Sequence, residues 1–315
     1  MRLYFCSDIH GSERCWKKFL ATPKHYECDA IVVGGDITGK FVVPVIEYKQ
    51  GRYKARFSGI ERKVKAGQEL DHLTGMIADA GQYAFVTTPD EYAWYAADSD
   101  RIDSLFRTLI LARVERWIDM AEDRLGGSGV QVLVSGANDD YFEIDEMLAK
   151  SSLIQDPNGQ VLDLADGFQI AGMGYGNITP WACPRDVSEA ELTRRIDDMM
   201  AAAADPGRTV MSLHVPPLGS GLDYAPQLDE ELRAVITAGG PQMVPVGSTA
   251  TRDAIATYRP LLGLHGHIHE SRGIRDVGGV PVGNPGSEYS EGILGGLLVD
   301  LDKRRGLVNT SLVRG

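Results

Sequence analysis

Five short apolar runs, each followed by polar side chains of the kind that bind metals, constrain the fold of this chain most. They are residues 3–7, 30–33, 130–134, 209–213 and 261–264. Short apolar runs bounded by turn residues are typical of buried strands. In open α/β sheets the residues that follow the strands gather at the carboxyl edge, where ligands bind. We therefore expect an α/β fold in which the polar side chains after these runs converge.

The fifth run leads into the stretch Gly266-His267-Ile268-His269. In an extended backbone, side chains two residues apart project to the same face, so His267 and His269 can point at one spot. Gly266 lets the chain pass close to whatever occupies that spot. Neutral imidazole binds zinc, iron, copper and nickel, which makes the stretch a candidate metal-binding segment. Taken alone, it is equally compatible with a histidine-rich strand end that faces solvent.

Carboxylates follow the first two runs. Asp8 and His10 share a face across one intervening residue, and this pairing is common among metal ligands. By itself, such a pair is more often an ion pair at the end of a strand. Asp36 follows Gly34-Gly35, and these glycines permit a tight turn that exposes the carboxylate at its tip.

The third and fourth runs lead into the remaining candidate ligands. Asn138 offers a neutral carbonyl oxygen, and Asp139 and Asp140 add negative charge beside it. In isolation, an Asn-Asp turn would explain these three residues. His214 follows the fourth run directly. Four of the seven histidines in the chain are among these candidate ligands, so convergence on one site is the simplest interpretation.

The segment from about 39 to 125 interrupts this pattern. Residues 41–57 predict a β-hairpin, and the three-and-four spacing of apolar residues over 102–118 predicts an amphipathic helix. Between them lie three aromatic residues, Tyr92, Trp94 and Tyr95. We interpret the segment as an insertion that partly supports the core and partly forms a rim or lid over the site. Trp117 is expected to be a core residue.

The rest of the chain adds a strand, helices and a closing hairpin. The strand is expected over residues 168–173, and the hairpin over 293–313. Helices are expected at residues 13–20, 188–204 and 248–258. Ser188 and Glu191 have the spacing of a capping box at the start of the second of these helices. Trp181, with Arg185 nearby, could form a wall of the substrate site, although Trp181 could equally anchor its loop.

Length and charge narrow the class of protein. The 315 residues can hold one large α/β domain with an insertion, or two domains. A formal net charge of −12 argues against a general nucleic-acid-binding surface. It is compatible with a small anionic substrate held by metal ions, because the local charge then outweighs the global one.

Cysteines and hydropathy bear on location. The four cysteines contain no CxxC pair, which argues against a zinc ribbon and fits the thiols of a reducing compartment. The first residues lack the apolar region of a signal peptide, and no apolar run has the length of a membrane-spanning helix. We therefore expect a cytoplasmic protein that does not associate with membranes; the oligomeric state is not predicted.

The candidate ligands, taken in order, resemble the calcineurin-like metallophosphoesterase superfamily. The series consists of Asp8-x-His10, Gly35-Asp36, Gly136-x-Asn138-Asp139, His214 and Gly266-His267-x-His269, and it spans almost the whole chain. Three segments further resemble a bacterial subgroup of Icc-like phosphoesterases: Thr179-Pro180-Trp181, His214-Val215-Pro216-Pro217 and Gly266-His267-Ile268-His269-Glu270. The resemblance implies one domain over residues 1–315, with the insertion at about 39–125. The implied fold is a sandwich of two mixed β-sheets flanked by helices.

The resemblance also implies a centre of two divalent transition-metal ions. One ion would be held by Asp8, His10, Asp36 and His269. The other would be held by Asp36, Asn138, His214 and His267. Asp36 would bridge the two ions, which activate a water molecule to attack a small phosphate-ester substrate. Manganese, iron, zinc and nickel all suit such ligands.

Asp139 departs from the pattern of the superfamily. Many members carry a histidine at this position, and that histidine protonates the leaving group. We therefore expect a phosphodiesterase, because diesters with good leaving groups depend less on an acid. The alternatives are a phosphomonoesterase or nucleotidase in which Asp139 or Asp140 is the catalytic acid, and a metal-binding scaffold without turnover.

Overall fold

Two mixed β-sheets form the body of the molecule in the computed structural model, which describes residues 1–315. The first sheet has six strands in the order β22-β21-β1-β2-β7-β8. Strands β1, β2, β7 and β8 run parallel to one another, and β21 and β22 add an antiparallel hairpin at the edge. The strands are β1 Arg2–Cys6, β2 Ala30–Val33, β7 Gln131–Val134, β8 Ile154–Gln155, β21 Gly295–Asp302 and β22 Gly306–Arg314.

The second sheet has five strands in the order β10-β13-β18-β20-β19. The first four are parallel, and β19 pairs antiparallel with β20. The strands are β10 Gln169–Met173, β13 Thr209–Leu213, β18 Leu262–Leu264, β19 Gly273–Val277 and β20 Val280–Asn284. The apolar runs of the sequence therefore supply the central strands of both sheets.

The two sheets pack face to face on a shared apolar core. Phe5 and Val32 of the first sheet and Ile170, Val210 and Leu262 of the second are fully buried in one cluster. Burying such side chains contributes about 1.5–3 kcal/mol each, which favours the packing of the two sheets against each other. The predicted sandwich of two mixed sheets is confirmed.

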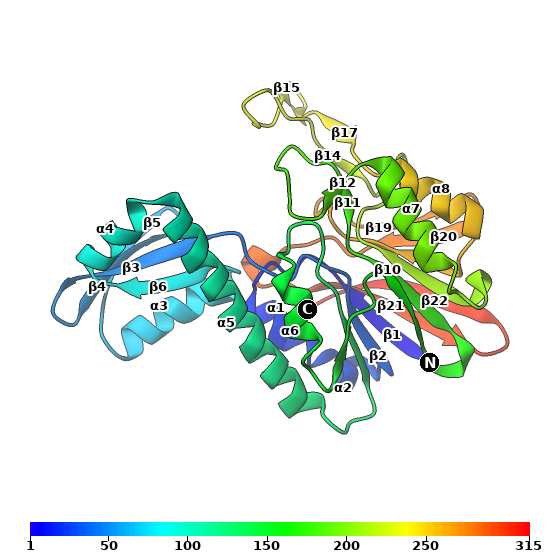
Figure 1. Ribbon diagram of the computed structural model, residues 1–315, viewed down its shortest axis with the longest axis horizontal. Helices are drawn as coiled ribbons and strands as arrows, with labels where there is room; N and C mark the ends of the chain where they lie inside the picture. Colours follow the sequence, from blue (N-terminus) through cyan, green and yellow to red (C-terminus); the bar gives the residue numbers. More distant parts are fainter.

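Helices cover the outer faces of both sheets (Figure 1). On the first sheet these are α1 Glu13–Phe19, α2 Thr22–Tyr26, α5 Ser99–Leu125 and α6 Glu143–Leu148. On the second they are α7 Glu189–Met200 and α8 Thr249–Tyr258. Serine side chains cap both α7 and α8. Ser188, the expected cap, accepts a hydrogen bond from the backbone N–H of Glu191, and Ser248 accepts one from that of Thr251.

A lobe beside the body is built from residues 42–96 (Figure 1). Its sheet has the order β5-β4-β3-β6, and α3 packs against it over Leu73 and Ile77. The elements are β3 Val42–Lys49, β4 Arg52–Phe57, β5 Ile60–Lys65, α3 Gln68–Asp79, β6 Tyr83–Thr87 and α4 Pro89–Ala96. The predicted hairpin corresponds to β3 and β4, whereas β5, α3 and β6 were not predicted.

Helix α5 joins the lobe to the body. It is longer than the predicted 102–118, because Asp98 caps its start and the helix continues to Leu125. Trp117 is buried and stacks on Trp16 of α1, with ring centroids 4.8 Å apart and ring planes 5° apart. Its predicted role as a core residue is confirmed.

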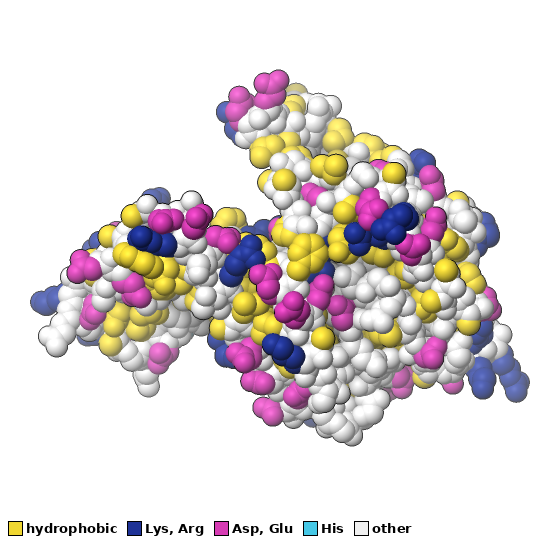
Figure 2. Space-filling view, viewed as in Figure 1, with side chains coloured by type: hydrophobic (Ala, Val, Ile, Leu, Met, Phe, Trp, Pro, Cys, Tyr) yellow, Lys and Arg dark blue, Asp and Glu magenta, His cyan; other side chains and the backbone are white.

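The remaining elements are short, and four of them build an arm that projects from the body. These four are β14 Tyr224–Pro226, β15 Ile236–Thr237, β16 Gly240–Pro241 and β17 Met243–Pro245. The others are β9 Gln160–Asp163, β11 Gly176–Asn177, β12 Asp186–Val187 and the 3₁₀ turns Ala165–Gly167, Pro206–Arg208 and Tyr289–Glu291. Figure 2 shows that the molecular surface is hollowed between the arm and the lobe. No helix in the structure combines the length and apolar character needed to span a bilayer.

Candidate metal centre

The polar residues that follow β1, β2, β7, β13 and β18 meet at the carboxyl edge of the two sheets. Three groups of possible ligands form there, and within each group the ligand atoms lie within 4.8 Å of one another. Two of the groups share no residue, and the third joins Asp139 to His10 and Asp36. The seven residues that the sequence singled out as ligands are all in or beside these groups: Asp8, His10, Asp36, Asn138, His214, His267 and His269.

The first group contains Asp8, His10 and His269. The Nε2 atoms of His10 and His269 are 3.1 Å apart, and Asp8 Oδ1 lies 3.3 Å from His269 Nε2. Ligand atoms that share one metal at bond lengths of about 2.0–2.2 Å lie about 3–3.5 Å apart. The spacing in this group therefore suits one metal ion.

The second group contains Asp36, His214 and His267, with Asn138 beside it. His214 Nε2 lies 3.4 Å from Asp36 Oδ2. His267 Nδ1 lies 3.1 Å from Asn138 Oδ1. These separations are again those of atoms that can face one metal ion.

Asp36 stands between the two groups. Its Oδ2 atom is 3.4 Å from His214 Nε2 and 3.7 Å from His10 Nε2. Its Oδ1 atom accepts the backbone N–H of Asp139 at 3.1 Å, which fixes the orientation of the carboxylate. One carboxylate thus faces the nitrogen ligands of both groups.

Four of these residues have a left-handed backbone conformation, which directs their side chains into the site. Asp8, His10, Asp36 and His267 have positive φ angles of 56°, 37°, 49° and 63°. For residues with a Cβ this conformation costs about 1–3 kcal/mol each, and it persists only where the surrounding structure enforces it. Because the sharp turn follows directly after the strand, each side chain is directed into the same space. Such strain clusters at functional sites.

Gly266 allows the loop after β18 to approach the first group. A Cβ atom at this position would overlap Asp8 Oδ2 and Ser7 Oγ. The close backbone also lets the N–H of His267 donate to the Asp8 carboxylate at 3.0 Å and 3.1 Å. The glycine of the motif is therefore a requirement of packing at the site.

Backbone carbonyls orient two of the imidazoles. His10 Nδ1 lies 3.2 Å from the carbonyl oxygen of Thr38, and His214 Nδ1 lies 3.0 Å from that of Gly34. Because a carbonyl can only accept, Nδ1 carries a proton in each ring, and Nε2 is left facing the site as the atom that could bind a metal. The Nε2 atom of His214 is buried without a hydrogen-bond partner. This nitrogen faces the carboxylates of Asp8 and Asp36, and a cation bound between them would interact with all three groups.

The charges of the site also favour a cation. Asp8 and Asp36 are only 1% and 3% exposed. Burial opposes their charge, but the nearby His214 outweighs it and keeps both pKa values below the ordinary range. Burial likewise opposes a charge on His214, yet the two carboxylates raise its pKa to about 9. Buried carboxylates are stable only when positive charge lies close to them, and metal ions can supply that charge. The residues present therefore fit a metal centre.

Asp139 lies at the rim of the centre and forms an ion pair. Its Oδ2 atom is 2.6 Å from the ammonium nitrogen of Lys40. A possible ligand atom of Asp139 also lies within 4.8 Å of those of His10 and Asp36. Lys40 was not singled out from the sequence, since a lysine after a turn has no pattern of its own.

Asp140 is placed unlike Asp139. It is fully buried, and its carboxylate accepts hydrogen bonds from the backbone N–H groups of Ile37, Thr38 and Ala137 and from the Thr38 hydroxyl. Burial, followed by the charge of Asp36, raises its pKa to about 6. With both oxygens engaged inside the protein, Asp140 ties the two ligand loops together and does not suit the role of a proton donor to substrate.

Arg185 corrects one sequence interpretation. It is fully buried and forms a two-point ion pair with Asp145, with nitrogen–oxygen distances of 2.7 Å and 2.9 Å. Arg185 is therefore a structural link and not part of a substrate wall. The nearby Trp181 remains 62% exposed, so it does not anchor its loop by burial.

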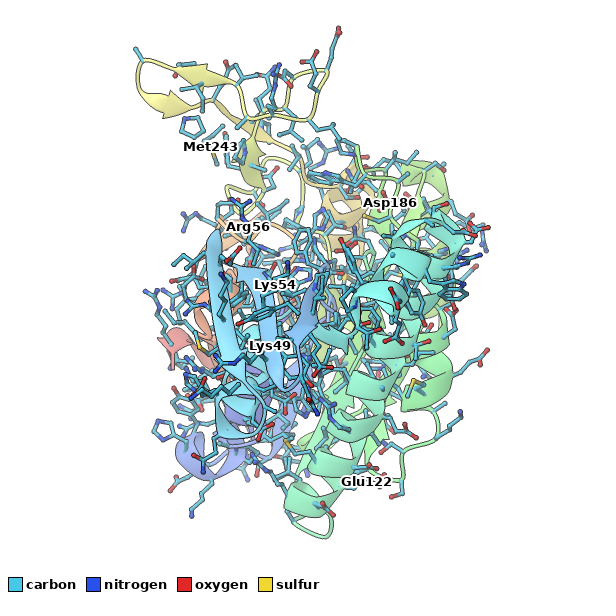
Figure 3. All side chains as sticks on the ribbon, turned by 90° about the vertical axis from the view of Figure 1, so that its left-hand side faces the viewer. Lys49, Lys54, Arg56, Glu122, Asp186 and Met243 are labelled. Atoms are coloured by element: carbon cyan, nitrogen blue, oxygen red, sulfur yellow. The ribbon has the colours of Figure 1, made fainter.

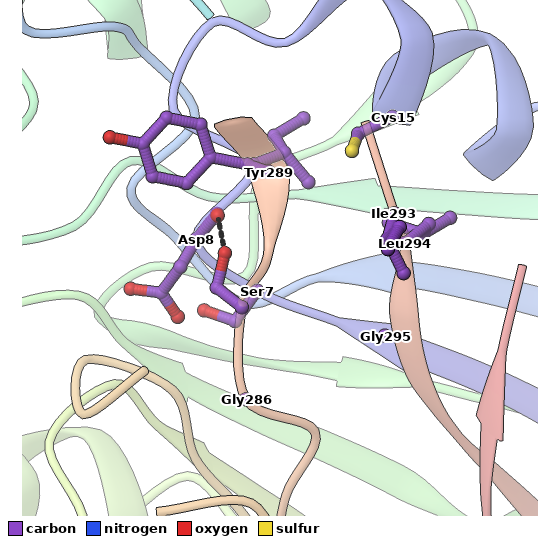
Figure 4. Close-up of a pocket in the computed structure, with 10 residues that line it drawn as sticks. Ser7, Asp8, Cys15, Gly286, Tyr289, Ile293, Leu294 and Gly295 are labelled. Carbon is purple, nitrogen blue, oxygen red and sulfur yellow. Dashed lines mark hydrogen bonds between the residues drawn. The ribbon is translucent and has the colours of Figure 1, made fainter. Parts of the chain in front are cut away.

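Two further residues at the site were missed because they follow an ordinary-looking turn. The hydroxyl of Ser287 donates to the carbonyl oxygen of Asp8 at 2.6 Å. The ring of Tyr289 lies 4.8 Å from that of His10 and 6.0 Å from that of His269. Figure 4 shows Tyr289 beside Asp8.

Comparison with known proteins gives matches at the level of three-dimensional structure. Neither the models of protein families nor the curated proteins include a match to this chain. TT1561 of Thermus thermophilus is 13% identical, covers 100% of this chain and 97% of its own, and has a TM-score of 0.54. Another solved structure is 15% identical over 99% of this chain and 98% of its own, also at 0.54. A structure described as a novel archaeal phosphodiesterase is 11% identical over 100% and 99% of the two chains, with a TM-score of 0.39, too low to carry an argument.

These likenesses concern the fold, and they agree with the architecture described above. Both stronger matches extend over almost the full length of each partner. The sandwich of two mixed sheets, its covering helices and the ligand residues at the carboxyl edge are the features that the ordered sequence motifs imply. The chain therefore shares its overall fold with TT1561 of Thermus thermophilus and with the other structure that has a TM-score of 0.54.

Proposed function

We propose that this protein is a metal-dependent phosphoesterase that hydrolyses small phosphate esters at a centre of two divalent transition-metal ions. The observation that carries the proposal is the position of Asp36. Its carboxylate faces His214 of one ligand group and His10 of the other, at 3.4 Å and 3.7 Å. A carboxylate placed between two nitrogen-rich groups can bind an ion in each group at once, and this arrangement is expected for a site with two metal ions and not for a site with one.

The proposed ligand sets follow the two groups. Asp8, His10 and His269 with Asp36 would hold one ion, and Asn138, His214 and His267 with Asp36 would hold the other. When bound, two such ions lower the pKa of a coordinated water and neutralise charge on the phosphoryl oxygens. The chain itself orients the imidazoles through Thr38 and Gly34.

The mixture of imidazole and carboxylate ligands restricts the type of metal. Manganese, iron, zinc and nickel suit such a set, whereas calcium and magnesium prefer oxygen ligands alone. We therefore propose a transition metal and leave its identity to elemental analysis.

Phosphodiesters are the proposed substrates because of Asp139. The Asp139 carboxylate is engaged in an ion pair with the Lys40 ammonium at 2.6 Å, in the place where the superfamily pattern has a histidine that protonates the leaving group. A positioned acid typically contributes about 10²–10⁴-fold, so esters with good leaving groups should be cleaved best. Diesters also bring less negative charge than monoesters to a protein of net charge −12.

A phosphomonoesterase or nucleotidase is the second candidate. The Lys40 cation favours it, since one more positive charge at the rim suits a doubly charged phosphate. A binding scaffold without turnover is less well supported, because a scaffold needs neither a shared carboxylate nor four strained ligand positions.

A matched pair of substrates separates the candidates. Protein reconstituted with manganese should hydrolyse bis(p-nitrophenyl) phosphate faster than p-nitrophenyl phosphate, as judged by kcat/KM. A clear preference for unactivated monoesters would favour the second candidate. Two bound metals without turnover of any ester would favour the scaffold.

A further inference from the structure

Lys40 is the one cation that the structure holds at the rim of the metal centre. Its ammonium pairs with Asp139 at 2.6 Å and makes no other hydrogen bond or ion pair. An ammonium has three donors, so two remain available. The Lys40 side chain is 41% exposed, unlike the buried carboxylates beneath it, and a substrate arriving from solvent can reach it.

The loop that carries Lys40 is held in place by hydrogen bonds just before the lysine. Asp140 accepts both the backbone N–H and the hydroxyl of Thr38, at 2.9 Å and 2.6 Å. The hydroxyl of Tyr83 accepts the N–H of Gly39 at 2.9 Å. Because the two residues before Lys40 are fixed, the start of its side chain is fixed as well, and Asp139 fixes its end.

Asp139 connects Lys40 to the candidate metal ligands. Asp139 donates its backbone N–H to Asp36, and its carboxylate lies within the group that includes His10. Because the Lys40 ammonium lies 2.6 Å from that carboxylate, its charge lies next to the ligand group and to a phosphate bound there.

We propose that the Lys40 ammonium binds the departing oxygen of the substrate and stabilises the negative charge that develops there, with Asp139 as the residue that positions it. This inference rests on the proposed function. It gives the site a leaving-group contact in the place where the sequence pattern lacks a histidine.

The step balances without a proton from Lys40. The oxygen of the attacking water bonds to phosphorus and the water releases one proton to solvent, while the bond between phosphorus and the departing oxygen breaks. The electron pair of that bond goes to the departing oxygen, which takes its proton from solvent. Burial opposes the charge of Lys40, but Asp139 and Asp36 outweigh it and raise the pKa of Lys40 above its ordinary value. The ammonium therefore keeps its proton and acts through its charge and hydrogen bond.

The competing explanation is that the pair only latches the loop after β2 to the loop after β7. A latch would affect folding and turnover of all substrates alike. A leaving-group contact instead affects substrates in proportion to the charge on the departing oxygen. The dependence of rate on leaving group therefore separates the two.

The test compares Lys40→Met with the wild type, both loaded with manganese, on aryl phosphodiesters whose leaving groups span a range of pKa. We expect kcat to fall about tenfold or more for the poorest leaving group and much less for p-nitrophenolate, because a hydrogen bond to a charged group is at stake. Lys40→Arg should recover most of the loss, since it keeps the charge. Asp139→Asn should resemble Lys40→Met, and the double variant should lose no more than either single one.

Two measurements besides activity complete the design. Lys40→Met and Asp139→Asn should each bind as much metal as the wild type. Lys40→Met should weaken the binding of inorganic phosphate, measured by calorimetry, by about tenfold. Lys54→Met is the matched control, because Lys54 lies on the exposed sheet of the lobe (Figure 3) and makes no ion pair. It should leave metal content, phosphate affinity and leaving-group dependence unchanged.

The outcomes are distinct. An equal loss for all leaving groups with a lowered Tm would establish a latch and overturn the inference, as would unchanged kinetics in Lys40→Met. If the wild type binds metal but hydrolyses no ester, the proposed function fails. Calorimetry then decides the inference, which is overturned if Lys40→Met binds inorganic phosphate as tightly as the wild type.

Discussion

At the scale of single residues, the candidate ligands could be identified from the sequence because each combines a suitable side chain with a place shortly after an apolar run. His267 and His269 satisfy both conditions, and the structure brings them to the predicted edge. Lys40 satisfies neither, and it was found only from its distance to Asp139. Positive φ at Asp8 was also beyond prediction, since only a packed environment enforces such strain in a residue with a Cβ.

Asp139 yields a prediction at this scale. Asp139→His should raise kcat/KM on esters with poor leaving groups more than on p-nitrophenyl esters. The substitution removes the anchor of Lys40, a loss of about tenfold. An imidazole near its ordinary pKa of about 6.5 can protonate the leaving group, and such an acid contributes about 10²–10⁴-fold to the rate. This gain in rate should exceed the loss caused by releasing Lys40.

The pH profile checks that variant. Activity of Asp139→His on poor leaving groups should fall as the pH rises above the pKa of the new histidine, because the donor loses its proton. The wild type should lack this decline. Equal changes for good and poor leaving groups would show that position 139 does not face the departing oxygen.

At the scale of elements, strands and helices with strong patterns were predicted and weak ones were not. Helix α5 has a continuous three-and-four apolar spacing, so its existence was clear. Strand β5 is Ile-Glu-Arg-Lys-Val-Lys at the edge of its sheet, where charged residues discourage aggregation and hide the alternation. Helix α3 begins after Gly67 without a side-chain cap, and it contains Gly75, so it lacks the usual signals.

The junction of α5 with α1 yields a stability prediction. Glu13 Oε2 accepts a hydrogen bond from Trp117 Nε1 at 2.8 Å and lies 3.9 Å from Arg113. Burial opposes the charge of Glu13, but these neighbours outweigh it and lower its pKa below the ordinary 4.5. A lowered folded-state pKa stabilises the fold above the unfolded value, and this stabilisation is lost as the pH falls through the folded value.

Glu13→Gln should therefore lower the free energy of unfolding in urea by about 1 kcal/mol at pH 7. The difference from the wild type should shrink below about pH 4.5, as the wild-type carboxylate becomes protonated. The exposed Glu61→Gln serves as the control and should have little effect at any pH. A difference that stays constant with pH would show that the charge of Glu13 contributes nothing.

At the scale of the whole molecule, the lobe and the arm border a hollow in the surface (Figure 2). The sequence indicated an insertion at about 39–125 from the break in pattern, and its role as a lid stays a prediction. The arm was not predicted, because strands of two or three residues carry no periodicity. Their arrangement follows from tertiary packing, which a local pattern does not encode.

The lid hypothesis is tested best at Tyr92. This side chain is 39% exposed, whereas Tyr95 packs edge-on against Phe85 and supports the lobe. Tyr92→Ala should change KM or the preference among substrates while leaving metal content and Tm unchanged. Tyr95→Ala should lower Tm as well. Unaltered selectivity in a well-folded Tyr92→Ala variant would count against a lid at this position.

The central claim is that Asp36 joins two metal sites, and metal stoichiometry tests it most directly. Elemental analysis of the purified protein reconstituted with manganese should give two ions per chain. Asp36→Asn should lose both, His10→Gln should lose mainly one, and His72→Gln, an exposed histidine of the lobe, should keep both. A wild-type protein that binds no metal after reconstitution, or an Asp36→Asn variant that retains two ions, would contradict the account.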